Sequence, residues 1–103
     1  MSTVTFPTKY VGETKKLVFD FISLLASGET ISTQVVAAAV WSGVDATPSS
    51  LISGSATASG TKVTQAVTDG VAGVIYKLTC TITTSAGQTL ILIGYLPVLT
   101  DPV

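Results

Sequence analysis

The chain has 103 residues, a formal net charge of −1 and only 11% charged residues, whereas 47% of its residues are hydrophobic. This length suits one small domain with a core of its own. Because the chain contains no His and no Arg, a Ser-His-Asp or Cys-His catalytic site and an arginine fork that reads bases are both excluded. Five lysines against six acids leave no cationic surface for nucleic acid.

The sequence also lacks the motifs of metal, cofactor and membrane sites. Its single cysteine, Cys80, cannot close a disulfide and would offer zinc one thiolate only. The acidic residues never take the spacing of a calcium loop, and no glycine run matches a phosphate-binding loop. The first residues lack the features of a signal peptide, and the apolar stretch 90–99 is too short for a membrane helix. We therefore expect no enzyme, no catalytic, cofactor or metal residues, and neither membrane nor nucleic acid as a partner.

Branched side chains predict an all-β protein from the N-terminus onwards. Thr, Val and Ile make up more than a third of the chain, and they favour strands over helices. Residues 1–14 are expected to be an N-terminal arm or an edge strand, because Pro7 cannot pair inside a sheet. Residues 15–103 are expected to be a single β-domain, which begins with strands over 15–25 and 31–41.

The second half of the chain continues the pattern. A short edge strand is expected within 53–60, and a further strand over 61–68 ends at a turn. From Val74 onwards the even positions are apolar while most odd positions carry Thr or Lys, and a turn at 85–88 makes 74–97 a hairpin. About six or seven strands, with turns at roughly ten-residue intervals, predict an antiparallel immunoglobulin-like β-sandwich. A small β-barrel is the alternative.

Two aromatic residues favour the sandwich over the barrel. Tyr76 follows a glycine-containing turn at the start of its strand, where immunoglobulin-like domains place a corner tyrosine. Trp41 ends the long strand 31–41, and we expect it to pack against the core from the opposite sheet.

The last strand is apolar on both faces. Its even positions from 90 to 96 are Leu or Gly, and its odd positions are Ile91, Ile93 and Tyr95, whereas an antiparallel sheet normally keeps one face polar. Either a segment of the same chain covers the second face, or another subunit does. The scarcity of charge and a mean hydropathy of +0.63 favour the second explanation. We therefore predict that Ile91, Ile93 and Tyr95 are interface residues in a homo-oligomer or a larger particle.

Two segments carry a resemblance to a known family. Residues 25–32 (LASGETIS) and 76–89 (YKLTCTITTSAGQT), in the order SGETIS…VWSG…GTKVTQ…YKLTCTITTSAGQTL…GYLPV, resemble short tailed-bacteriophage proteins described as fibre–tail adaptors or small virion proteins. The similarity extends over residues 15–99.

The resemblance implies a non-enzymatic virion component that is made in the bacterial host cytoplasm. It would be an adaptor at the neck or tail, with portal, tail, fibre or capsid proteins as partners, and with contacts through apolar strand faces and β-edges. Two alternatives stay open. One is a capsid decoration or cement protein, and the other is a receptor- or glycan-binding module in which Trp41 or Tyr95 stacks on a sugar.

Overall fold

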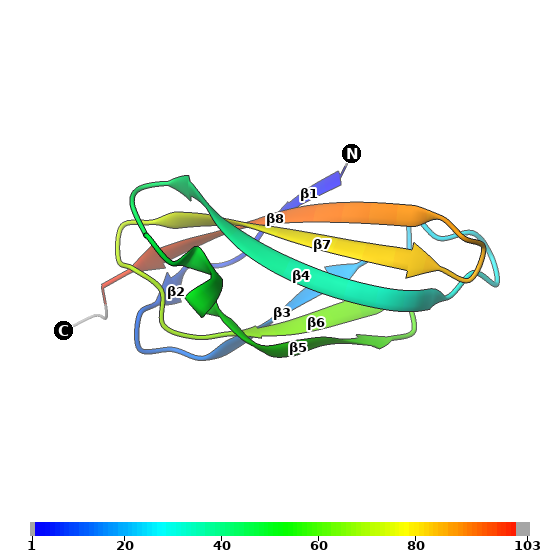
Figure 1. Cartoon of the computed structure of the whole chain (residues 1–103), viewed down its shortest axis with the longest axis horizontal. Coiled ribbons are helices and arrows are strands. Elements are labelled where there is room, and N and C mark those ends of the chain that lie inside the picture. The colour runs from blue at the N-terminus through cyan, green and yellow to red at the C-terminus, as the bar shows by residue number, and fades with distance from the viewer. Residues whose placement is uncertain (1, 101–103) are drawn as a thin grey trace.

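The computed structural model describes residues 2–100, which form two layers of β-strands (Figure 1). The elements in chain order are β1 (Ser2–Thr5), β2 (Lys9–Tyr10), β3 (Lys15–Asp20), β4 (Ile31–Ser42), the short 3₁₀ helix η1 (Pro48–Leu51), β5 (Ile52–Ser59), β6 (Lys62–Val67), β7 (Ile75–Thr84) and β8 (Thr89–Leu99). The layers make an elongated molecule with extents of 47 × 20 × 20 Å.

The two sheets have the strand order of an immunoglobulin-like sandwich. The five-stranded sheet has the order β1-β8-β7-β4, with β2 also on β8, and the three-stranded sheet has the order β3-β6-β5. In the immunoglobulin scheme these correspond to strands C, F and G facing B, E and D. The predicted β-sandwich is confirmed, because the described residues form two separate sheets and no closed barrel.

The N-terminal segment lies along the edge of the five-stranded sheet. β1 and β2 pair one after the other with β8, and both run parallel to it. Pro7 lies between them and has no N–H for the ladder, which explains the interruption.

Alternation along the strands forms the core between the layers. In β7 the even positions from Tyr76 to Thr84 are buried while the odd ones are half-buried, as the sequence predicted. The core cluster comprises Leu17, Phe19, Phe21, Val36, Leu51, Val63, Val67, Val74, Tyr76, Leu78, Cys80, Ile82, Leu92, Leu96 and Val98. It therefore takes side chains from both sheets.

The strand expected over 15–25 is shorter in the structure. β3 ends at Asp20, because the Phe21 carbonyl accepts the N–H groups of Leu24 and Leu25 and so begins a turn. Leu24 and Leu25 both pack partly against the core, which the alternation of a continuous strand would not allow.

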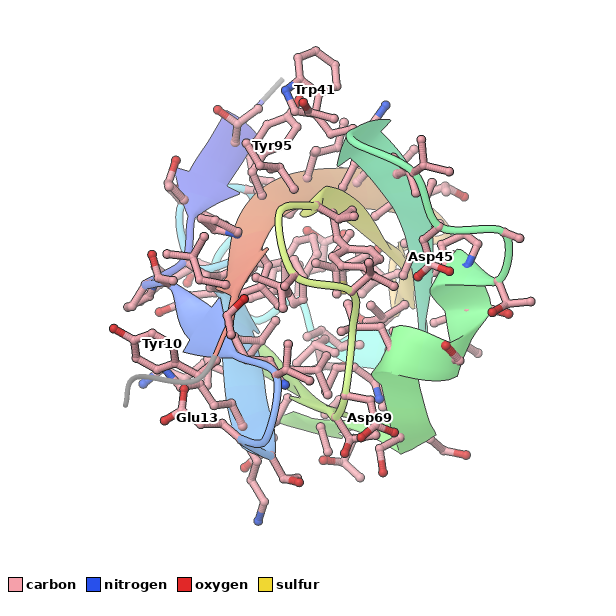
Figure 2. All side chains as sticks on the ribbon, turned by 90° about the vertical axis from the view of Figure 1, so that its left-hand side faces the viewer. Tyr10, Glu13, Trp41, Asp45, Asp69 and Tyr95 are labelled. Carbon is pink, nitrogen blue, oxygen red and sulfur yellow. The ribbon has the colours of Figure 1, made fainter. Side chains whose placement is uncertain are left out.

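Tyr76 forms the corner that its sequence position predicted. The Val71 N–H donates to the Tyr76 hydroxyl over 2.8 Å, and that hydroxyl donates to Asp45 Oδ2 over 2.6 Å. Burial, together with the hydrogen bond to Asp45, raises the pKa of Tyr76 to about 12. The same bond lowers the pKa of Asp45. Figure 2 shows Asp45 at this end of the molecule. The hydrogen bond to Asp45 joins the loop before η1 to the start of β7.

A buried lysine holds the N-terminal segment at the same end. Lys9 is fully buried, and its ammonium donates to the carbonyls of Tyr10, Val11 and Asp69 at 2.9, 3.2 and 2.6 Å. These charge-assisted bonds offset the cost of burying the ammonium. They also join β2 to the loop between β6 and β7.

Phe6 and Gly94 form a second attachment. Gly94 lies opposite Val4 in the β1–β8 pair, and a Cβ on Gly94 would lie only 2.3 Å from Phe6 Cε2. The Phe6 ring meets the buried Phe19 edge-on, with 5.3 Å between centroids. The missing side chain at position 94 thus makes room for Phe6 between the sheets.

Candidate interface

The predicted interface residues lie on the outer face of the five-stranded sheet, which we define as the side turned away from the three-stranded sheet. Ile91, Ile93 and Tyr95 alternate with the core residues Leu92 and Leu96, so they point away from the core. β1, β7 and β4 complete this face with their odd-numbered residues, mostly Thr and Ala.

The three residues differ in how far solvent reaches them. Ile91 is 43% exposed, whereas Ile93 is only 8% exposed. Ile93 pairs with Thr3 on one side and with Thr79 on the other, and these neighbours in the sheet shield it although it lies outside the core. The β1–β8 pairing begins at Ser2 and Leu92, so no described residue of β1 pairs with Ile91, and this side chain stays accessible.

Trp41 lies on this outer face, so the expectation that it packs from the opposite sheet is wrong. In β4 the even positions Val36, Ala38 and Val40 pack on the core, and Trp41 points the other way, 61% exposed. Its ring contacts Tyr95 on β8, with 5.2 Å between centroids and a 60° tilt. Figure 2 shows the two rings together at the outer side of the sheet.

The sequence could not reveal this aromatic pair. Trp41 and Tyr95 come from strands that are not adjacent, since β7 lies between β4 and β8. Lys77 of β7 pairs with both Ala39 and Tyr95, and this register brings the two rings close together. Period-two alternation in the last strand predicted that Tyr95 faces outwards, whereas Trp41 was expected in the core.

The outer faces of the two sheets differ in charge. The three-stranded sheet exposes Lys16, Asp20 and Lys62 on its outer side. On the outer face of the five-stranded sheet, Lys77 is the one charged residue among the described residues. Val35, which is 59% exposed, adds a further apolar side chain there. An exposed apolar surface with so little charge is typical of a contact site between proteins.

At the end of the molecule opposite Tyr76 and Lys9, the loop before β4 contacts the β7–β8 turn. The Ser85 N–H donates to the Thr30 carbonyl over 2.9 Å, and the Thr30 N–H donates to Ser85 Oγ over 3.0 Å. Glu29 accepts hydrogen bonds from the Thr84 hydroxyl and, over 2.9 Å, from the Ala26 N–H, and these bonds lower its pKa. The two segments that carry the family resemblance therefore contact each other.

Within residues 2–100 no three His, Cys, Asp or Glu side chains gather in a way that would hold a metal ion. Burial raises the pKa of Cys80 to about 12, so this side chain is a neutral thiol at physiological pH. No helix in this part of the chain is long and apolar enough to span a bilayer.

Comparison with known families decides which class of protein this is. The family model described as "Podophage GP4 fiber-tail adaptor protein gp77" matches residues 9–91, from β2 into β8. The chain belongs to this family. The match confirms the resemblance found in the sequence, and it makes the chain a structural adaptor of a phage particle that binds other virion proteins such as the fibre. No protein among the curated sequences matches the chain.

Proposed function

We propose that this fibre-tail adaptor acts at the neck or tail as a homo-oligomer and uses the outer face of the five-stranded sheet as its main contact surface. The observation that carries the proposal is the exposed apolar group on that face, formed by Trp41, Ile91 and Val35, beside a single charge at Lys77. An isolated subunit would keep these side chains in water, whereas a neighbouring subunit or a partner protein would bury them.

The size of this face favours repeated contacts in an assembly. Neighbouring strands lie about 4.8 Å apart, and each strand rises about 3.3 Å per residue. With these dimensions, the outer face formed by β1, β8, β7 and β4 has an area of roughly 600 Å². A standard interface uses about 800 Å² from each partner. One such contact is therefore modest, and a closed ring of subunits would gain strength by making the contact at every subunit.

Matched variants test the proposal. Ile91 is 43% exposed on the outer face, and Val18 is 45% exposed on the outer side of the other sheet. We expect Ile91→Lys to abolish incorporation into particles and Val18→Lys to leave it unchanged, as measured by quantitative mass spectrometry of purified virions. Equal incorporation of both variants would show that the outer face is not the contact surface.

Ile91→Lys and one further variant, Trp41→Ala, distinguish the tail position from a capsid position and a structural role from glycan binding. If Ile91→Lys removes the chain from tailless heads instead of from tails, the decoration role on the capsid holds. If Trp41→Ala abolishes saturable binding of the isolated protein to host polysaccharide while particles retain the variant, then the Trp41–Tyr95 pair binds a glycan.

A further inference from the structure

β4 has one free edge in the described part of the chain. This strand of 12 residues pairs only with β7, and the other edge of its backbone has no strand beside it in the described chain. It contains neither a charged residue nor a proline, although natural edge strands normally carry such protection against pairing with other chains. Its two irregularities lie near its ends, between Ile31 and Thr33 and between Val40 and Ser42. The stretch 33–40 is left regular and unprotected.

The remaining edges each carry protection of some kind. β1 has four residues, and β3 carries Lys15, Lys16 and Asp20. β5 is irregular between Ser53 and Thr57. Since short length, charge and bulges all oppose pairing with another strand, the middle of β4 is the edge best suited to accept one.

A groove lies directly beside this edge. A cavity of about 340 Å³ is lined by Gln34, Val35 and Val36 of β4, by Ile52 and residues 54–56 of β5, and by Gln65. β4 and β5 are each an edge strand of their own sheet. The groove therefore opens where an added strand on β4 would place its inward side chains.

The irregular segment of β5 that lines this groove, between Ser53 and Thr57, is held by the buried side chain of Gln65. Gln65 is 1% exposed, and its amide nitrogen donates to the carbonyls of Ser53 and Gly54, each over 3.2 Å. Across the groove, the Gln34 amide donates to the Ala56 carbonyl over 3.1 Å. Specific hydrogen bonds therefore hold β5 in its irregular conformation, as expected of a β-bulge that is a defined feature of the sheet.

We propose that an extended, uncharged segment of a different virion protein adds to β4 as a further strand and inserts an uncharged side chain into this groove. The proposal rests on the adaptor function proposed above. Main-chain hydrogen bonds would supply affinity, and the groove would select the side chain. A neutral segment fits because neither β4 nor the lining of the groove contains a charge. The regular part of β4, residues 33–40, is long enough to pair with a strand of the usual five or six residues, about 17–20 Å.

Another copy of the chain would not fill the site. Its β4 could pair edge to edge, but Val36 and Ala38 of that copy would face its own core, so the groove would stay empty. Its N-terminal segment is already paired with β8. An extended segment of another protein has both a free backbone and free side chains.

Site-specific photo-crosslinking in assembled virions tests the proposal. A benzophenone amino acid replaces Ser55, which lines the groove, or Thr57, which pairs with Thr64 two residues further along β5. We expect the probe at position 55 to crosslink to one segment of a different virion protein, and the probe at 57 to give no such product. No product from position 55, or a product with another copy of this chain, would overturn the proposal.

A third probe at position 91 separates the two proposals. If position 91 crosslinks and position 55 does not, the groove proposal fails and the contact through the outer face stands. If the chain is absent from virions, the adaptor function fails and the groove proposal falls with it. As a second measurement, Ser55→Trp should fill the groove and lower retention of the partner in virions about tenfold or more, whereas Thr57→Trp should leave retention unchanged. Equal retention with both variants would also overturn the proposal.

Discussion

Replacing Gly94 with Ala tests how the N-terminal segment is attached to the sandwich. The new Cβ would lie 2.3 Å from Phe6 Cε2 and 3.1 Å from Val4 Cγ2, whereas ordinary contact begins at 3.4 Å. The Phe6 ring would have to move by about 1 Å, by comparison with that contact distance. It cannot move inwards, because Phe19 meets it edge-on and is fully buried.

The expected cost follows from two opposing effects. Overpacking of this kind costs about 1–3 kcal/mol, and removing a glycine from the middle of a strand returns about 0.5–1 kcal/mol through lower chain entropy. We therefore expect Gly94→Ala to lower the free energy of unfolding by about 1 kcal/mol, the difference between the middle values of these two ranges. In a domain of this size each kcal/mol corresponds to a fall in Tm of about 4–8 °C.

Urea unfolding followed by circular dichroism measures this cost, and a double-mutant cycle identifies its cause. Phe6→Ala vacates the space above Gly94, so Gly94→Ala in that background should be neutral or slightly stabilising. If Gly94→Ala costs the same with and without the Phe6 ring, contact with Phe6 is not the reason for the glycine, and the reasoning is refuted.

Three buried side chains, Tyr76, Lys9 and Cys80, allow further tests. Tyr76→Phe should lower the free energy of unfolding in urea by about 1–3 kcal/mol, because Asp45 and the Val71 N–H lose their hydrogen-bond partner. Since folding raises the pKa of Tyr76 to about 12, the stability linked to this group should be complete below pH 10 and fall as the pH rises towards 12. A wild-type stability that stays constant over that pH range would contradict this role of Tyr76. Lys9→Met should also lower the free energy of unfolding by about 1–3 kcal/mol, since three carbonyls lose their donor. Lys16 is exposed, so Lys16→Met should change stability by less than about 0.5 kcal/mol. Equal effects of the two substitutions would argue against a structural role for the buried ammonium. Cys80 should resist a thiol reagent in the folded protein, because it is buried and its pKa is raised to about 12, and it should react at the rate of a free thiol in urea; rapid labelling without urea would show that the core opens.

The position of each strand was largely predictable, and the neighbours of each strand were not. Alternation in β7 and the turn at 85–88 are local patterns, and the structure places them as expected. The end of β3 at Asp20 escaped prediction, because the apolar residues up to Leu25 continue the pattern while the backbone already turns. The same holds for the candidate interface. The alternation of residues in the last strand predicted that Ile91 and Tyr95 point outwards, whereas the position of Trp41 beside Tyr95 depends on the register of β4 and β8 on β7.

The sequence was enough to predict the class of fold, the corner at Tyr76 and the two apolar faces of the last strand, because branched residues, turn residues and alternation act over a few neighbouring positions. It also determined the family, through segments that the family model matches. Three features became visible only in the folded chain: Trp41 packs against Tyr95, Phe6 fills the space above Gly94, and an uncharged edge lies beside a groove. These features depend on strand register and on contacts between residues far apart in the chain, which no local pattern encodes.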